Sequence, residues 1–222
     1  MEESNLFIPF RQKAYEGEAL VKRVSDFYTF MNQRRSLREF SSKPVPKEVI
    51  EKIIMTASSA PSGANKQPWT FCAISNPEVK KQIREAAEKE EKINYSGRMS
   101  DSWLQDLKPF ATDEHKPFLE IAPWIIVVFK RSFEVEKANK KNNYYVSESV
   151  GLAAGFLLTA IHNAGLVALT HTPSPMNFLV KVLDRPKNEK PYLLIPVGYA
   201  PENATVPDIK RKSKEEVIVF YE

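Results

Sequence analysis

Cysteine, histidine and glycine are all scarce in this chain of 222 residues, and each scarcity excludes a class of site. The single cysteine, Cys72, leaves no intramolecular disulfide and no Cys-x-x-Cys metal site. The three histidines lack the spacing and the carboxylate neighbours of a metal centre, so we predict no metal. The seven glycines form neither a GxGxxG nor a Walker A pattern, so no dinucleotide fingerprint or ATP site is indicated.

A strong excess of one charge is also missing. The 32 basic and 28 acidic residues leave a net charge of only +4, and the two signs are interspersed. A nucleic-acid binder would gather its basic residues on one face or in one tail. With 42% hydrophobic and 27% charged residues, the composition is that of an ordinary globular protein. We therefore predict no nucleic-acid partner.

Long apolar runs are limited to one segment, residues 150–169, which is about as long as a bilayer is thick. His162 and Asn163 lie inside it, so we predict a central helix buried on all sides, followed by a strand. The acidic N-terminus lacks the basic and apolar parts of a signal peptide. These features predict no membrane partner and a cytoplasmic location.

Helical and strand patterns alternate along the rest of the chain, which predicts an α/β sandwich around a central sheet. Asn76 and Pro77 predict the start of one helix, as its cap and its first position. Polar composition predicts a mobile flap over 96–118 and a charged loop over 130–143, and a strand-like run ends the tail. The remaining predicted elements are helices at 17–34, 46–59, 145–165 and 176–183, and strands at 69–75, 121–129, 167–172 and 192–200.

The predicted organisation has three parts. Residues 1–16 form an N-terminal arm, residues 17–200 form the main domain, and residues 201–222 form a C-terminal extension. The extension offers few partners for its own side chains, so we expect it to wrap around a second subunit.

A cationic cluster, "RRSLREF", brings Arg34, Arg35, Ser36 and Arg38 into five residues. Arginine presents two charge-assisted donors in a planar fork, and several such forks around a hydroxyl suit a phosphate dianion. A second basic group, Lys210–Lys212, could close on the same phosphate from the tail. Composition alone leaves open that the cluster is a solvated helix end.

Several motifs together resemble the flavin-binding nitroreductase superfamily: "RRSLREF", "APSGANKQPWTF", "THTP", "LLIPVGYA" and "PDIKRK". The stretch "EEKINY", followed by a downstream lysine, is similar to the iodotyrosine deiodinase branch. The resemblance covers about residues 25–220. It implies a nitroreductase-like α/β (α+β) sandwich, a central mixed sheet flanked by helices, a homodimer, and FMN as cofactor.

The resemblance also implies the cofactor contacts. The cationic cluster would hold the FMN phosphate and ribityl chain, and a Pro-Ser-Gly loop would lie along the flavin, where backbone must approach a flat ring. The Thr172 hydroxyl would contact flavin N5 as the catalytic group, whereas His171 stands where animal members often have threonine, so its contact stays open. The implied residues are Arg34, Arg35, Ser36, Arg38, Pro61, Ser62, Gly63, Thr170, His171, Thr172 and Arg211.

The implied substrate side is a lid over about residues 91–116. Glu91, Tyr95 and Lys116 would bind the zwitterion of a halogenated tyrosine, and the Ala64 N–H would meet its phenolate. Glu91 and Tyr95 are four apart and so share a helix face. Taken alone, Glu91 or Lys116 is better explained as a surface charge, and only its joint placement with Tyr95 and the flavin motifs favours the binding role.

The implied activity is that of an oxidoreductase: reductive dehalogenation of iodotyrosine to tyrosine and iodide through one-electron flavin steps. The electron donor stays unidentified, either NAD(P)H directly or a redox protein. One alternative is a broad NAD(P)H-dependent nitroreductase or quinone reductase, which has no use for the lid residues. Another is a non-enzymatic protein that binds flavin or halotyrosine.

Overall fold

The computed structural model describes residues 7–136 and 139–222, so the first six residues of the predicted arm lie outside it. Its Cα arrangement divides the chain into two compact units, Met1–Arg34 and Arg35–Glu222. The first unit holds one long helix, α1 (Gly17–Asn32), as the apolar spacing predicts. No residue of α1 is buried, and the apolar residues that produced the pattern, among them Val21, Val24 and Phe27, are exposed.

The second unit is built on a four-stranded sheet in the order β1-β2-β6-β5. Its ladders are antiparallel throughout, and one isolated parallel bridge, Ser36 to Ala168, adds the segment after α1 to the β5 edge. The strands are β1 (Trp69–Ile74), β2 (Trp124–Arg131), β5 (Val167–Ala168) and β6 (Glu189–Gly198).

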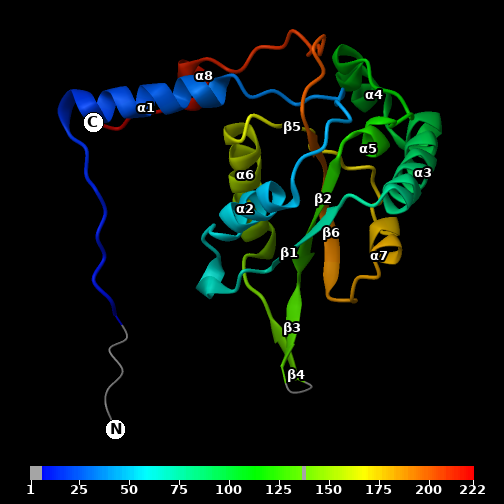
Figure 1. Ribbon diagram of the computed structural model, residues 1–222, viewed down its shortest axis with the longest axis horizontal. Coiled ribbons are helices and arrows are strands. Elements are labelled where there is room, and N and C mark those ends of the chain that lie inside the picture. The colour runs from blue at the N-terminus through cyan, green and yellow to red at the C-terminus, as the bar shows by residue number, and fades with distance from the viewer. Residues whose placement is uncertain (1–6, 137–138) are drawn as a thin grey trace. The chain divides into compact units, whose positions relative to one another are not determined.

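Helices cover both faces of this sheet (Figure 1). One layer holds α2 (Lys47–Ser58) and α6 (Val146–Asn163), and the other holds α3 (Pro77–Ile93), α5 (Phe118–Ile121) and α7 (Phe178–Val182). Residues 125–129 of β2 have no exposed surface. Ile126 and Val128 pack into one core and Ile125, Val127 and Phe129 into the other, as alternation along a strand requires. The predicted sandwich is confirmed.

The predicted cap of α3 is confirmed in atomic detail. Asn76 Oδ1 accepts the backbone N–H groups of Glu78 at 2.9 Å and Val79 at 3.2 Å, and Pro77 occupies the first helical position. Ile83 and Ala87 face the core, so the helix carries its last turn, with Glu91, toward the same interior.

Two predicted irregular segments are regular instead. The flap contains a helix, α4 (Asp101–Leu107), whose cap Ser100 accepts the Trp103 N–H at 3.3 Å. The charged loop, apart from 137–138, which are not described, contains the hairpin strands β3 (Phe133–Glu136) and β4 (Asn139–Asn142). Glu134 stands opposite Lys141, and such opposite charges stabilise a strand pair.

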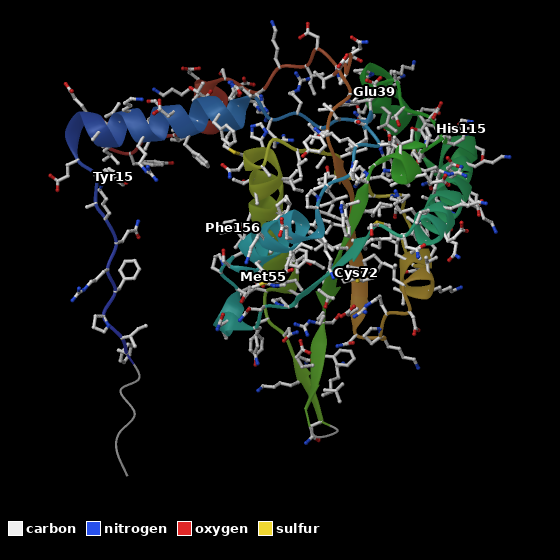
Figure 2. The ribbon with its side chains drawn as sticks, in the orientation of Figure 1. Tyr15, Glu39, Met55, Cys72, His115 and Phe156 are labelled. Carbon is white, nitrogen blue, oxygen red and sulfur yellow. The ribbon has the colours of Figure 1, made fainter. Side chains whose placement is uncertain are left out.

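Two further expectations are wrong. The tail contains a short helix, α8 (Lys214–Val217), which begins at a capping box on Ser213, and residues 218–222 after it form no strand. Helix α6 is not buried on all sides, because Leu152 and Phe156 are exposed; Phe156 and Met55 of α2 extend from the outer side of their layer (Figure 2). None of the described helices is long and apolar enough to span a bilayer.

Candidate functional site

The cationic cluster lies along the β5 edge of the sheet. Ser36 forms the parallel bridge with Ala168, and the Leu37 N–H donates to the Ala168 carbonyl at 3.2 Å. Leu37 is buried, so its neighbours Ser36 and Arg38 alternate to the opposite side and are half-buried. Arg34 ends the first unit and directly precedes Arg35.

The C-terminal extension runs beside this cluster. The Arg35 guanidinium donates to the Pro207 carbonyl, and the Glu39 carboxylate accepts the Thr205 N–H at 3.2 Å. Arg211, the implied tail contact, is exposed and follows Pro207 by four residues. The cationic cluster and Lys210–Lys212 are far apart in sequence. The contacts of Arg35 and Glu39 with residues 205–207 join the segments that carry them.

Arg38 is the member of the cluster that turns toward the lid. Its guanidinium lies 5.2 Å from the centre of the Phe110 ring, a cation–π distance. Burial lowers the pKa of Arg38, and Tyr95 opposes this effect. Across the described part of the chain, no carboxylate forms an ion pair with Arg38. A half-buried guanidinium without an anionic partner is suited to binding one.

The segment Thr170–Thr172 follows β5. His171 exchanges backbone hydrogen bonds with Leu194 of β6, at 2.9 and 3.0 Å, so the segment is attached to the sheet at its middle residue. Thr170 and Thr172 are exposed and flank it. This alternation presents both threonine hydroxyls on the open side of the segment, as a flavin contact requires.

The His171 side chain points the other way, into the protein. Its ring stands edge-on to Phe118 at 5.7 Å, and its Nε2 atom is buried with no hydrogen-bond partner. Burial, followed by the charges of Lys116 and Arg38, lowers the pKa of His171 from 6.5 to about 3. His171 is therefore neutral at physiological pH and lies beneath the threonine face rather than in it.

The three implied lid residues come together. Glu91 and Lys116 are only 5% and 2% exposed, and Lys116 Nζ lies 3.8 Å from the Glu91 carboxylate. The same ammonium lies 5.6 Å from the centre of the Tyr95 ring. Tyr95 Oη donates to the Thr112 carbonyl at 3.0 Å. The surface-charge alternative is thus excluded for both Glu91 and Lys116.

Lys116 has further partners within the lid. Its ammonium donates to the Thr112 hydroxyl at 3.2 Å and to the Asp113 carbonyl, and its backbone N–H donates to Glu88 at 2.7 Å. Burial lowers the pKa of Lys116 and raises that of Glu91, and each charge only partly offsets the shift of the other. A ligand that brings a carboxylate to one and an ammonium to the other would stabilise both charged forms.

The Pro61–Ala64 loop lies elsewhere, against the start of α6. The Gly63 N–H donates to Ser149 Oγ at 3.3 Å, and a Cβ at Gly63 would lie 2.9 Å from the Tyr145 ring, so only glycine fits. Ala64 has a left-handed backbone, with φ of 49°. Such strain in a non-glycine residue is typical of functional loops. Its other hydrogen bonds join Ser62 and Gly63 to residues 65–67, directly after the loop. Among the described residues, the contacts of Arg35, Arg38 and the lid trio lead to other segments and do not reach this loop.

The structure therefore joins Arg38 and His171 to the lid trio, and places the threonine segment and the cationic cluster on one sheet edge. It does not bring the Pro61–Ala64 loop into this group. Sequence reasoning missed Glu88, which accepts the Lys116 backbone N–H, and Asn94, which donates to the Ser174 carbonyl. Each acts through a backbone group that is distant in sequence. Among the described residues, no group of three or more His, Cys, Asp or Glu side chains could hold a metal ion.

Comparison with known proteins identifies relatives of high similarity. The nitroreductase family model matches residues 31–199. The iodotyrosine deiodinase of Haliscomenobacter hydrossis is 59% identical over 222 residues, which is 100% of both chains. Iodotyrosine deiodinase 1 of Homo sapiens is 44% identical over 220 residues, 98% of this chain and 76% of the human protein.

Solved structures give the same picture. The crystal structure of oxidized iodotyrosine deiodinase bound to FMN and 3-iodo-L-tyrosine superposes with a TM-score of 0.74 and 31% identity, covering 88% of this chain and 98% of that one. A nitroreductase with bound FMN from Bacteroides fragilis has a TM-score of 0.65 at 19% identity, which shows the fold alone.

Proposed function

This chain belongs to the nitroreductase family, within its iodotyrosine deiodinase branch, and we propose that it removes iodide from iodotyrosine reductively with FMN as cofactor. The observation that carries the substrate assignment is the buried pair Glu91–Lys116 beside Tyr95. A nitroreductase of broad specificity has no need to bury two opposite charges next to a phenol.

The residues present fit FMN. Arg38, half-buried and without a carboxylate partner, supports an anionic ligand at the sheet edge, and Arg35 with Ser36 lies beside it. The tail contact at Pro207 supports a contribution from Arg211, and chain connectivity supports one from Arg34. Thr170 and Thr172 are exposed and offer hydroxyls to a bound flavin, and the Thr172 hydroxyl would donate to flavin N5. When bound, FMN supplies the electrons for carbon–halogen cleavage.

The lid selects a zwitterion. Lys116 and Glu91 satisfy one another incompletely, because 3.8 Å separates the ammonium from the carboxylate. An α-amino acid replaces that contact with two, its carboxylate on Lys116 and its ammonium on Glu91, while Tyr95 adds a phenol donor. A ligand with one charge would leave the opposite buried group without compensation. Residues 91–116 then exclude water from the reacting ring.

The Pro61–Ala64 loop supports a homodimeric site. It belongs to the α2–α6 layer, whereas the lid belongs to the α3–α5 layer. We infer that the loop of a second copy completes the cofactor site, with its Pro61, Ser62 and Gly63 along the flavin and the Ala64 N–H on the substrate phenolate. The wrapping tail and a cytoplasmic location remain predictions, as does the electron donor, NAD(P)H or a redox protein.

The test is a titration of the FMN-loaded protein with 3-iodotyrosine, followed by flavin fluorescence. We expect strong quenching by 3-iodotyrosine and much weaker quenching by tyrosine, because iodine lowers the phenol pKa and favours phenolate binding. Lys116→Gln should weaken 3-iodotyrosine binding by about 2–4 kcal/mol, because it leaves Glu91 and the ligand carboxylate without a cation.

The control is the rate at which the Lys116→Gln variant reduces a nitroaromatic compound. This rate should equal that of the wild type, since the reaction uses the flavin without the lid charges. Equal quenching by iodotyrosine and tyrosine, with rapid NAD(P)H-driven nitro reduction, would favour the broad nitroreductase instead. Flavin binding without turnover of either substrate would favour a binding protein.

A further inference from the structure

Two side chains of the π-helical turn that follows α3 (Asn94–Arg98) converge on one backbone carbonyl. Asn94 Nδ2 donates to the Ser174 carbonyl at 3.0 Å, and Arg98 Nη1 donates to the same oxygen at 3.1 Å. The two donors also hold each other, because Arg98 Nη1 lies 3.0 Å from Asn94 Oδ1. The Glu90 carboxylate completes the cluster at 2.9 Å from Arg98.

On the lid side, the cluster belongs to the turn that binds substrate under the proposed function. Asn94 directly precedes Tyr95 and follows Glu91 by three residues, and it is only 4% exposed. The Arg98 side chain is 42% exposed, so water screens its contact. Asn94 therefore supplies the buried and better-defined link to Ser174.

On the cofactor side, Ser174 is two residues from Thr172, whose hydroxyl is assigned to flavin N5. Pro173 and Pro175 flank Ser174, and proline fixes its own φ and restricts the residue before it. Few free dihedrals therefore separate the Ser174 carbonyl from Thr172. Because His171 is attached to Leu194 of β6, Thr172 lies between one anchor on the sheet and one on the lid.

We propose that Asn94 is a positioning residue that couples the halotyrosine-binding turn to Thr172 through the Ser174 carbonyl. Substrate held by Glu91 and Tyr95 immobilises the segment Asn94–Arg98. Through the bond from Asn94 to the Ser174 carbonyl, this segment then keeps the Thr172 hydroxyl in place for the flavin. The inference rests on the proposed function and adds to it a route by which substrate on the lid affects the cofactor side.

The experiment compares Asn94→Ala and Asn94→Asp with the wild-type protein, all loaded with FMN. Ser96→Ala is the matched control, because Ser96 is an exposed residue of the same turn that bonds only to carbonyls of its own helix. The measurements are the Kd for 3-iodotyrosine from flavin quenching, kcat and KM for deiodination, and the rate of nitroaromatic reduction.

Asn94→Ala should lower kcat for deiodination by about tenfold, the loss expected for a buried hydrogen bond, with a smaller change in KM. Nitroaromatic reduction should fall less than deiodination, because it does not depend on a substrate held by the lid. Asn94→Asp should be worse than Asn94→Ala, because a carboxylate oxygen would face the Ser174 carbonyl. A role in packing alone predicts the reverse order, since aspartate preserves the shape of asparagine.

A double-mutant cycle with Thr172→Ala tests the coupling. In the Thr172→Ala background, Asn94→Ala should have much less effect on kcat than in the wild type. An equal effect in both backgrounds, an Asp variant milder than the Ala variant, or a wild-type kcat in Asn94→Ala would overturn the inference. A wild-type protein that holds FMN but does not bind 3-iodotyrosine would overturn the proposed function and this inference with it.

Discussion

The charge of His171 is decided by its surroundings and not by its own chemistry. Its imidazole is packed against Phe118, with the cations Arg38 and Lys116 nearby, and its Nε2 atom has no partner. A proton on this ring would be both desolvated and repelled, which is why the pKa falls to about 3. On unfolding the ring regains water and its ordinary pKa of 6.5.

This difference makes folding stability depend on pH. Between pH 6.5 and about 3 the unfolded chain binds a proton at His171 that the folded chain does not, so the free energy of unfolding falls as the pH falls through this window. The largest slope from one such group is about 1.4 kcal/mol per pH unit. His171→Thr should remove that contribution, so the variant should lose less stability than the wild type between pH 6.5 and 5.

Urea unfolding of the FMN-loaded wild type and His171→Thr variant at several pH values measures the free energy of unfolding of each. The contributions of groups that are the same in both proteins cancel in the difference between the two values. His171→Gln serves as a second neutral replacement of more similar size and should flatten the dependence equally. If the free energy of unfolding depends on pH equally in the wild type and both variants, His171 takes up its proton in the folded protein as readily as in the unfolded chain. That result would contradict the prediction.

Sequence reasoning at the residue scale succeeded where the chemistry is local and failed where it is not. The arginines of residues 34–38 are neighbours in the chain, so the cationic cluster can be recognised from the sequence alone. The motif resemblance brought together Glu91 and Lys116, 25 residues apart, which no local pattern joins. The orphan nitrogen of His171 and the link from Asn94 to Ser174 depend on the tertiary fold, and no residue pattern indicates either.

At the scale of elements, α3 is fastened to the segment around α5 by a series of polar contacts. Glu88 accepts the Lys116 backbone N–H at 2.7 Å and pairs with Arg84, whose Nε donates to Glu120 at 2.6 Å. Lys80 donates to the carbonyls of Glu120 and Ala122, both at 2.8 Å. These contacts hold Lys116 at its distance from Glu91 before any ligand arrives.

Glu88→Ala removes the acceptor of the Lys116 backbone N–H. We expect it to weaken 3-iodotyrosine binding by about 1–2 kcal/mol, the cost of an unmet buried hydrogen bond, while FMN retention and nitroaromatic reduction are unchanged. Glu88→Gln, which keeps an acceptor for the N–H, should lose less. Glu85→Ala alters an exposed glutamate of the same helix and is the control. The measurement is the Kd for 3-iodotyrosine of the wild type and the three variants. If Glu88→Ala binds 3-iodotyrosine as tightly as the wild type, other contacts position the lid.

The same scale shows what a single sequence can predict about the fold. The cap at Asn76 and the apolar run of β2 are local signals, and both elements formed where they were predicted, with β2 beginning three residues later than its run. The β3–β4 hairpin was missed because its many charges resemble those of a solvated loop. Its stability comes from cross-strand pairs such as Glu134 with Lys141, which only the register reveals.

At the scale of the whole molecule, many apolar side chains are exposed, among them groups in α1, in α6 and in the tail. In α1 they include Val21, Val24 and Phe27; on the outer side of α6 they are Leu152 and Phe156, which are 50% and 40% exposed. The tail exposes Val219 at 74% and Phe220 at 66%. A monomer that left all of these in water would be prone to associate. Together with the separation of the Pro61–Ala64 loop from the lid, they favour a second copy as the partner.

Phe156→Lys tests this assembly, because a lysine on the outer face of α6 places a charge in the proposed subunit contact. Gly155, beside Phe156, has open space above its Cα, which lets another backbone approach closely.

We expect wild-type protein to sediment as a dimer and the Phe156→Lys variant to shift toward monomer at the same concentration. FMN should be lost in parallel, since in the proposed dimer the loop of the other copy completes the cofactor site. Val135→Lys adds the same charge at an exposed apolar position of the β3–β4 hairpin, away from the α2–α6 layer, and should remain dimeric and yellow. A monomeric variant that retains FMN would mean that one chain holds the cofactor alone, and the Pro61–Ala64 loop would then need another role.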